Sequence, residues 1–511
     1  MYAPLVMGTT WDALVIGSGF GGSVSALRLA EKGHRVAVLE MGRRIGPSDM
    51  ERATRDPRAF VWAPWLGLSG YFSQELFRHV TIVRGVGVGG GSIVYGAVLL
   101  RPGAPFYVDP AWSELDVDWQ SELAPHYETA AQKLGVETCP HFGPMDAHLR
   151  ATAERMGRLE TFGPTPLGIR FEDCTLCGEC LSGCRYGAKN TLDLNYLKEA
   201  EALGVQVLTD RKATSIRPLD EGGYEVTTEH PQHADERVTL RAQRVVLAAG
   251  VLGTLELLYR CRDEHRTLPR VSDQLGRVVR TNSEAIVGVV SDAPEEDLTR
   301  GPAISSHFWA DERTHITQNR FSPAYEFLKL QVGPLVDGAN RTGRALRTLA
   351  EMARHPIAST DSARRTDWHR AVSPLTVMQD EDSHLSMRWG TRLLPPVGRG
   401  LVSRVEAGSA PPSYLPQANE AARIFAEVAG GTPFNGLTET LLGTSTTAHI
   451  LGGCHMGRST RDGVIGTDHG LFGYPGLYVV DGSAVSANPG VNPSLTITAL
   501  AERAMSLVPS A

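Results

Sequence analysis

Two polar residues near the C-terminal end of the chain carry the side chains that alcohol oxidation requires. His449 opens the stretch His449–Gly457, and Asn492 lies in Gly490–Thr496, at the start of a predicted helix. Oxidising an alcohol removes the hydroxyl proton while a hydride leaves the carbon, and imidazole has the unperturbed pKa best suited to accept that proton near neutral pH. The Asn492 amide can orient the alcohol oxygen by hydrogen bonding. The pair therefore predicts a base and a positioning residue.

Two alternatives to this assignment are contained in the same region. His455, six residues later, is a competing base, and His449 itself can be a core histidine bonded to a backbone carbonyl. A predicted strand at Leu477–Val480 leads into Asp481 and Gly482, shortly before the predicted helix. In dinucleotide-binding folds, a strand end followed by a helix start lies beside the reactive ring of the cofactor. This context favours a catalytic histidine.

The elements that must position this chemistry begin near the N-terminus with a glycine-rich turn. An apolar strand, Trp11–Ile16, precedes the turn, a periodic helical stretch follows it, and a second apolar strand ends at Glu40. The residues of the turn predicted to hold a dinucleotide are Gly17, Ser18, Gly19 and Gly22. The three glycines allow, in order, a tight turn, close approach of the backbone to a pyrophosphate, and close helix–strand packing. Glu40 is placed to accept hydrogen bonds from a ribose, so the unit predicts dinucleotide binding without separating FAD from NAD.

A second glycine cluster, Arg84–Ser92, favours FAD. Its backbone is too rich in glycine for a packed strand or helix and contains no P-loop lysine, so it suits contact with a flat ring or a diphosphate. A flexible surface loop is the alternative, but the apolar flanks Val80–Val83 and Ile93–Leu99 favour burial. The residues of this cluster expected at the cofactor are Gly89, Gly90, Gly91 and Ser92.

Composition limits the classes of protein to which the chain can belong. Its 511 residues suggest two or three domains, and its 54 glycines cluster rather than repeat. The formal net charge of -7 argues against a nucleic-acid binder, and no stretch of about 18 uncharged apolar residues predicts a membrane span. The first residues lack the basic segment of a signal peptide, and the grouping of the seven cysteines does not suit a disulfide scaffold. We therefore expect a cytoplasmic protein.

Four of the cysteines have the spacing of a bacterial ferredoxin. They are Cys174, Cys177, Cys180 and Cys184. Thiolates at these positions can hold an iron–sulfur cluster that passes electrons from a flavin to an external acceptor. Arg185 follows the fourth cysteine where a ferredoxin has proline, which favours buried structural thiols instead. Zinc is the third alternative, so the sequence assigns no metal to these residues.

Several long motifs in a fixed order resemble the glucose–methanol–choline (GMC) oxidoreductases, most closely their bacterial cholesterol-oxidase-like branch. The motifs are GSGFGGSVSALRLAEKG, GVGVGGGS, GAKNTLDLNYL, VVLAAGVLGT, HILGGC and YVVDGSAVSANPGVNPSLTITALAERA. The resemblance covers nearly the whole chain and implies an α/β fold with two domains. A discontinuous Rossmann-like FAD-binding domain would comprise 1–285 and 441–511, with inserted segments near 45–80 and 103–165. A mixed-sheet substrate-binding domain would comprise 286–440.

The resemblance also implies roles for individual residues. It implies FAD, the oxidation of an alcohol to a carbonyl, and a catalytic histidine with an asparagine partner, which correspond to His449 and Asn492. Asp481 and Gly482 correspond to contacts with the ribityl and phosphate region of the flavin. Ala213 corresponds to a small residue over the adenine, in the strand-like stretch 205–216.

Two features of the sequence bear on the substrate. Tyr95 stands where cholesterol-oxidase-like relatives have an asparagine near the flavin. The predicted strand Thr376–Met387 is interrupted by Asp380, Glu381 and Asp382. If that strand faces the pocket, Glu381 is a candidate carboxylate near the chemistry, and the three acids favour a sugar or aminosugar over a sterol, which would leave them desolvated. A solvent-exposed strand end is the alternative.

The predicted function is therefore an FAD-dependent oxidoreductase that passes a hydride from a small-molecule alcohol to flavin N5 and is reoxidised by oxygen or another acceptor. A sterol oxidase is the main alternative. A 3-ketosteroid reductase or isomerase-like flavoprotein on the same scaffold is a second enzymatic alternative, because a fold does not determine function. A flavin and iron–sulfur electron-transfer protein built around Cys174–Cys184 is the non-enzymatic alternative. Of these, only the alcohol oxidoreductases predict bleaching of the flavin by an alcohol.

Overall fold

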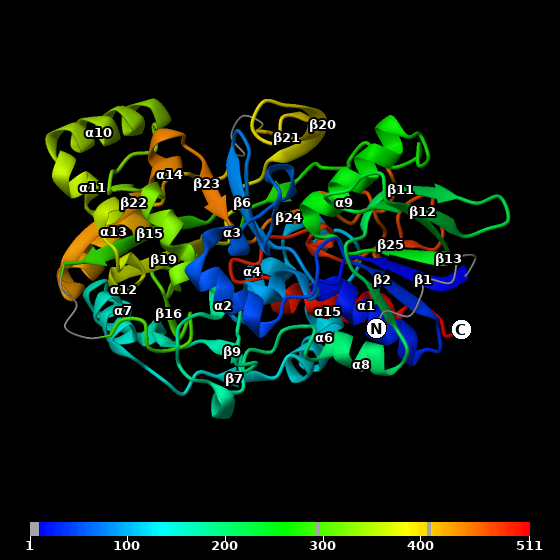
Figure 1. The fold of residues 1–511 in the computed structure, drawn as a ribbon, viewed down its shortest axis with the longest axis horizontal. Coiled ribbons are helices and arrows are strands. Elements are labelled where there is room, and N and C mark those ends of the chain that lie inside the picture. Colours follow the sequence, from blue (N-terminus) through cyan, green and yellow to red (C-terminus); the bar gives the residue numbers. More distant parts are fainter. Residues whose placement is uncertain (1–9, 293–296, 406–409) are drawn as a thin grey trace.

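The computed structural model describes residues 10–292, 297–405 and 410–511, and in these residues the first of two large sheets is of the dinucleotide-binding type. Five parallel strands are paired in the order β10, β2, β1, β13 and β25. Figure 1 shows this sheet in the right-hand half of the molecule. The strands are β1 (Thr10–Ile16), β2 (Val36–Leu39), β10 (Gln206–Leu208), β13 (Arg237–Leu247) and β25 (Leu477–Val479).

The strand β13 lies at the centre of this sheet and has two different neighbours on one side. Its second half pairs with β25, while its first half pairs with β12 (Tyr224–Glu229), which forms an antiparallel hairpin with β11 (Lys212–Pro218). The strand-like stretch 205–216 is therefore divided between β10 and β11. Asp210, between them, has a φ of +56°, which is a turn conformation that a continuous strand does not allow.

The second large sheet is antiparallel throughout, in place of the expected mixed sheet. Its strands are paired in the order β18, β22, β15, β19, β17, β16 and β8, and α13 (Pro416–Ala429) packs on it. Antiparallel neighbours need only short connections, as between β16 and β17. The strands are β8 (Gly163–Pro164), β15 (Ala285–Ser291), β16 (Ser306–Trp309), β17 (Thr314–Gln318), β18 (Val332–Pro334), β19 (Val372–Gln379) and β22 (Gly431–Gly436).

The predicted strand over 376–387 is divided in the structure. β19 ends at Gln379, and the next strand, β20 (Ser386–Arg392), forms a separate hairpin with β21 (Gly398–Arg404). The acidic residues lie in the loop between β19 and β20. The helix α10 (Arg341–Arg354) lies between β18 and β19 in the chain.

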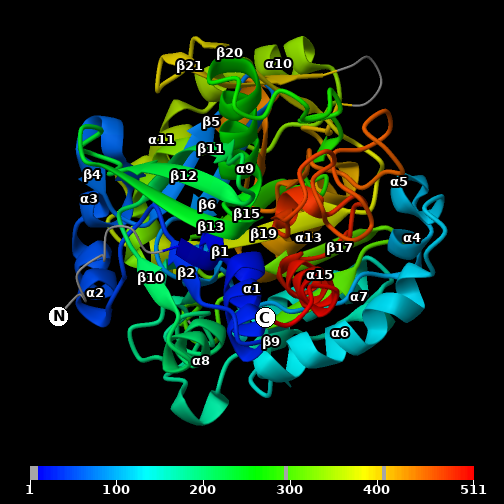
Figure 2. The ribbon, with the colours of Figure 1, turned by 90° about the vertical axis from the view of Figure 1, so that its right-hand side faces the viewer.

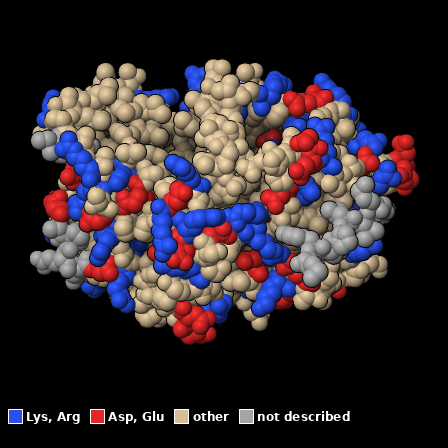
Figure 3. Space-filling model, in the orientation of Figure 1, with Lys and Arg blue, Asp and Glu red and all other residues tan. Residues whose placement is uncertain are grey.

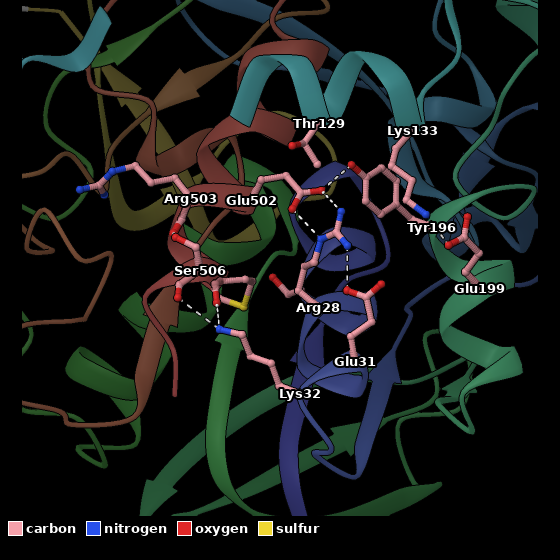
Figure 4. A network of polar contacts seen from close by, with 12 residues as sticks. Arg28, Glu31, Lys32, Thr129, Lys133, Tyr196, Glu199, Glu502, Arg503 and Ser506 are labelled. Carbon is pink, nitrogen blue, oxygen red and sulfur yellow. Dashed lines mark hydrogen bonds and ion pairs between the residues drawn. The ribbon is translucent and has the colours of Figure 1, made fainter. Parts of the chain in front are cut away.

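The C-terminal helix is tied to the helix that follows the first glycine turn. Figure 2 shows α15 (Ser494–Ser506) beside α1 (Phe20–Glu31), with α8 (Tyr196–Ala202) also against α1. Figure 4 shows that the carboxylate of Glu502 accepts hydrogen bonds from Arg28 Nε and Nη2 and from the Tyr196 hydroxyl, at 2.6, 2.9 and 2.6 Å. Helix α15 starts just after Asn492, and α1 starts just after the turn at Gly17–Gly19. The bonds between these helices therefore hold Asn492 in a fixed position relative to the glycine turn.

Replacing Glu502 by leucine is expected to lower the free energy of unfolding by about 3–5 kcal/mol, because Arg28 loses its buried partner. The Glu502 side chain is only 4% exposed. Glu31→Ala removes the other carboxylate that contacts Arg28. Because the Glu31 side chain is 40% exposed, this substitution is expected to lower the free energy of unfolding by at most about 1 kcal/mol. Urea unfolding of the FAD-loaded protein measures both changes. Equal losses in the two variants would show that the buried contact contributes no more than the surface pair.

Among the described residues, no helix has the length and apolarity required to span a bilayer. On the face seen in Figure 3, acidic and basic side chains are interspersed over the lower part of the molecule.

Candidate functional site

The two glycine clusters meet in the structure. The hydroxyl of Ser18 accepts a hydrogen bond from the Gly89 N–H at 3.1 Å and lies 3.3 Å from the Gly87 carbonyl. A Cβ added to Gly90, whose φ is +54°, would lie 2.7 Å from Gly19 Cα. This close approach of two bare backbones explains why both segments are rich in glycine and forms a cradle for a ligand that contacts main-chain N–H groups.

The turn at Gly17 fits a bound pyrophosphate. Gly17 has a φ of +101°, and a Cβ there would lie 2.2 Å from the Ala248 carbonyl. A Cβ on Gly22 would lie 1.9 Å from the Gly17 carbonyl, so this glycine allows α1 to pack against the turn. The N-terminus of α1 is directed at the cradle, where its unpaired N–H groups and positive end favour an anion. These observations fit the pyrophosphate of FAD.

Glu40 lies in the same cradle and is buried. Its carboxylate accepts hydrogen bonds from Ser18 N and Oγ at 3.1 and 2.6 Å, and from Gly42 N at 2.9 Å. Burial raises the pKa of this carboxyl, and those hydrogen bonds act in the opposite direction by stabilising the charged form. The carboxylate is therefore held beside the cavity, at the place where a ribose of a dinucleotide would lie.

One large cavity, of about 470 Å³, connects this cradle with the predicted catalytic residues. Gly22, Gly89 and Ser92 do not line it and instead support its wall, since Ser92 Oγ donates to the Gly89 carbonyl and accepts from Leu192 N. The predicted residues that line the cavity are Gly17, Ser18, Gly19, Glu40, Gly90, Gly91, Ala213, His449, Asp481, Gly482 and Asn492.

Asp481 and Tyr95 both line the cavity. Asp481 accepts hydrogen bonds from Thr254 Oγ1 and from Ser483 N and Oγ, which hold its carboxylate at the end of β25. The Tyr95 hydroxyl donates to the Asn190 carbonyl at 2.8 Å, and burial raises its pKa. The phenol is therefore held by the protein itself, in a segment that also contacts the second glycine cluster.

The predicted catalytic residues form a contact with each other inside the cavity. Asn492 Nδ2 lies 3.2 Å from His449 Nε2, and on the other side of the ring His449 Nδ1 lies 2.5 Å from Glu284 Oε1. This second contact is an ion-pair contact without normal hydrogen-bond geometry at Nδ1. The other oxygen of Glu284 accepts the Ala448 N–H at 2.8 Å.

These contacts determine which nitrogen of His449 can act as a base. A carboxylate beside Nδ1 stabilises a proton on that nitrogen, so Nε2 of the neutral ring carries the lone pair. In the absence of a substrate, Asn492 Nδ2 donates to this lone pair, and both residues line the cavity, where a substrate hydroxyl can replace the amide. The arrangement can accept a proton from a hydroxyl group and stabilise the imidazolium that results.

Glu284 is the residue that the sequence analysis missed. Glu284 follows Asn282 and Ser283, whose φ values of +59° and +45° are left-handed, and it directly precedes β15. Strained backbone of this kind is enriched at functional sites. The signal available in the sequence was a single acid at the start of the otherwise apolar stretch Ala285–Val290.

The competing base, His455, is not part of the cavity. Its side chain is buried, its Nε2 lies 3.1 Å from the Asp462 carbonyl, and burial lowers its pKa. A hydrogen bond from Nε2 to a carbonyl oxygen requires a proton on that nitrogen. This is the core histidine bonded to a backbone carbonyl that was the alternative for His449.

The acids Asp380, Glu381 and Asp382 do not line the cavity, so of the two alternatives the structure agrees with a strand end outside the pocket. Arg313 forms ion pairs with Asp380 and Glu381 at 2.7 and 3.2 Å, and Arg280 pairs with Asp382 at 2.9 Å. Because β19 ends at Gln379, the acidic residues turn away from the sheet and meet these guanidinium groups outside the pocket.

The four cysteines at 174–184 are free thiols that line a second, small cavity. Among the residues that the structure describes, no three His, Cys, Asp or Glu side chains converge as ligands of a single metal ion. The spacing of the cysteines is therefore not accompanied by a site of the zinc type.

Comparison with known proteins agrees with this geometry. Models of the N- and C-terminal parts of the GMC oxidoreductases match residues 11–270 and 416–501. The chain is 39% identical to a cholesterol oxidase of Acinetobacter baumannii, over 98% of this chain and 94% of that protein. It is 38% identical to a cholesterol oxidase of Mycobacterium tuberculosis, over 98% and 91% of the two chains.

Two more distant relatives have the same organisation. A long-chain-alcohol oxidase of Arabidopsis thaliana is 24% identical over 96% of this chain and 66% of its own length. The crystal structure of pyridoxine 4-oxidase from Mesorbium loti superposes with a TM-score of 0.67 and 17% identity, over 97% of this chain and 98% of that one, which shows a shared fold. The family models and the 39% identity over nearly the full length lead to one conclusion: the chain belongs to the glucose–methanol–choline (GMC) oxidoreductase family.

Proposed function

We propose that this protein oxidises an alcohol with a large apolar body, of the sterol type, with FAD as hydride acceptor and His449 as base. The observation that carries the catalytic part is the contact chain from Glu284 through His449 to Asn492 on the wall of the cavity. The FAD that members of this family bind would supply the two-electron acceptor. Its pyrophosphate would lie on the glycine cradle at Gly17 and Gly90.

The residues of this chain would divide the reaction between them. His449 Nε2 accepts the hydroxyl proton, and the Glu284 carboxylate stabilises the positive charge that then develops on the ring. The alcohol hydroxyl would take the place of the Asn492 amide at the Nε2 lone pair, and Asn492 Nδ2 would then donate a hydrogen bond to the alcohol oxygen. As the oxygen loses its proton, the carbinol C–H bond is weakened for departure of the hydride toward the flavin.

The walls of the cavity support an apolar substrate. The aromatic and aliphatic side chains on its wall include Phe72, Phe321, Tyr325, Leu328, Trp368 and Phe434. Glu439 also lines it, and burial raises the pKa of this carboxyl to about 8, so it is uncharged at pH 7. Polar side chains such as Asn319, Gln331 and Thr376 also line the cavity. The aromatic and aliphatic surface favours a fused-ring alcohol, which would gain about 0.8 kcal/mol for each buried methylene.

An anaerobic titration followed at the flavin absorbance tests this proposal. Cholesterol is expected to bleach the flavin with a KM at least about 10²-fold lower than that of cyclohexanol, because the same carbinol is attached to a larger apolar body. Glucose and an aminoglycoside are expected to leave the flavin oxidised. Bleaching by a sugar in preference to a sterol would contradict the substrate class, and no bleaching by any alcohol would contradict the reaction itself.

A further inference from the structure

A short turn carries Glu284 and is bonded to the two segments that carry His449 and Asn492. This turn, Thr281–Glu284, connects β14 (Val279–Arg280) to β15. Each of its residues is at most 1% exposed, and the two in its centre have left-handed backbones. Such a backbone persists only where the surrounding structure holds it in place. The proposed reaction uses the side chain of Glu284 and leaves the rest of the turn unexplained.

The hydroxyl of Thr447 connects the turn to the backbone of His449. It donates to the Thr281 carbonyl at 2.9 Å and accepts the His449 N–H at 2.9 Å. Because a carbonyl oxygen only accepts and a backbone N–H only donates, both roles of this hydroxyl are determined. Thr447 is the last residue of β23 (Ser445–Thr447) and is fully buried, so no solvent competes for either bond.

The carboxylate of Glu284 holds the same segment at two further points. One of its oxygens accepts the Ala448 N–H at 2.8 Å, and the other lies 2.5 Å from His449 Nδ1. Together with the Thr447 hydroxyl, the turn therefore fixes the N–H groups of two successive residues and one side of the imidazole ring. The ring cannot change its position without breaking contacts to the turn.

The side chain of Asn282 connects the turn to the other residue of the proposed pair. Its Nδ2 donates to the Val491 carbonyl at 3.0 Å, directly before Asn492. The carbonyl only accepts, which requires the amide nitrogen to face it. The main-chain carbonyl of Asn282 accepts from Gln379 N at 3.2 Å, at the end of β19. Asparagine adopts a left-handed backbone more readily than most residues, so Asn282 supplies both the conformation of the turn and the donor.

We propose that Thr447 and Asn282 are positioning residues, which hold the base and its amide partner in fixed positions relative to Glu284. This inference rests on the proposed alcohol oxidation. Neither residue lines the cavity, so neither touches the alcohol. Their effect is on geometry: Asn492 Nδ2 and His449 Nε2 are 3.2 Å apart, and a substrate hydroxyl must fit between them. A misplacement of about 1 Å in such an arrangement can slow a reaction about 10²-fold.

Replacing Thr447 by valine tests the first link. Valine keeps the shape of the side chain but leaves the His449 N–H and the Thr281 carbonyl without their partner. We expect anaerobic reduction of the flavin by cholesterol to slow about 10- to 10²-fold, with KM within about threefold of the wild type because the cavity walls are unchanged. Thr447→Ser keeps the hydroxyl and is expected to react within about threefold of the wild-type rate. A wild-type rate in the valine variant, or equal losses in both variants, would overturn the role of this hydroxyl.

The matched control is Thr348→Val. Thr348 is also fully buried, and its hydroxyl donates to the Arg344 carbonyl within α10, at 2.9 Å. It does not line the cavity, so its replacement is expected to leave the rate within about threefold of the wild type. A loss as large as that of Thr447→Val would show that removing any buried hydroxyl slows the reaction, and would contradict a specific role for Thr447.

Asn282→Asp tests the second link. Aspartate has nearly the same size and also tolerates the left-handed backbone, but it places an oxygen opposite the Val491 carbonyl. We expect kcat to fall about 10- to 10²-fold with KM within about threefold of the wild type. An unchanged kcat would remove Asn282 from the group of positioning residues.

Crystal structures of the FAD-loaded variants distinguish this inference from the proposed function. In Thr447→Val we expect His449 Nδ1 to lie at least about 1 Å farther from Glu284 than in the wild type, and in Thr447→Ser we expect it to stay in place. If the valine variant does not fold, the separation of Asn492 from His449 in Asn282→Asp gives the same test. An unmoved ring or amide would overturn the inference. Displacement as expected, in a protein whose wild type no alcohol reduces, would contradict the proposed function alone.

Discussion

Replacing His449 by alanine is expected to slow reduction of the flavin by alcohol about 10²- to 10⁴-fold, because the substitution removes the Nε2 that would accept the hydroxyl proton beside Asn492. The variant should retain its FAD, since the glycine cradle and Glu40 are formed by the other end of the chain. Stopped-flow absorbance under anaerobic conditions measures the rate, and the visible spectrum measures the bound flavin.

The matched control for this substitution is His455→Ala. Both histidines lie on the same short segment, but His455 is bonded to the Asp462 carbonyl and does not line the cavity. Its replacement is expected to leave the rate of flavin reduction within about threefold of the wild type while lowering stability by about 1–3 kcal/mol, as for a lost buried hydrogen bond. If instead the His455 variant lost the reaction and the His449 variant kept it, the two assignments would have to be exchanged.

Replacing Glu284 by glutamine is expected to lower kcat about 10³-fold with little change in KM. The amide keeps the shape of the side chain but removes the charge beside Nδ1, so the imidazolium is no longer stabilised and the tautomer is no longer determined. Because the substitution changes the charge beside His449 and leaves the aromatic wall of the cavity intact, binding should be largely unaffected. Steady-state kinetics with a sterol separates these two parameters.

Glu439→Gln is the control for removal of a carboxyl group from this cavity. The raised pKa of about 8 keeps Glu439 protonated at pH 7, so replacing it by an amide removes no charge there. We expect kcat at pH 7 to change by less than about tenfold, with a larger difference from wild type above pH 8, where Glu439 ionises near Glu284. Equal losses for both variants at pH 7 would contradict the special role of Glu284.

The local elements of the FAD cradle were predictable from the sequence. The apolar strand Trp11–Ile16, the turn from Gly17 and the helix that follows occur as expected, because each depends on residues adjacent in the chain. The second glycine cluster lies beside the first, and its Gly90 and Gly91 line the cavity while Gly89 and Ser92 support the wall. The sequence could not show this difference, since it depends on which main-chain atoms face Ser18.

Contacts between distant segments were not predictable in the same way. Glu284 reaches His449 only because β15 begins in the second sheet beside the segment that carries the histidine. The position of the acids at 380–382 stayed open in the sequence because it depends on where β19 ends, at Gln379, and on Arg313, which pairs with Asp380. Hydrophobic periodicity predicts a strand, but it does not show which charged side chain lies beside the end of that strand.

The sequence alone thus identified the two glycine clusters, the proposed catalytic pair and the cysteine spacing, because turn geometry, periodicity and motif order are local properties of a chain. Only the tertiary structure decided that His449 and not His455 lines the cavity, that the Glu284 carboxylate lies beside its Nδ1, and which aromatic and polar side chains share the pocket. Burial and ion pairing depend on which surfaces the folded sheets bring together, and this information is spread over the whole chain.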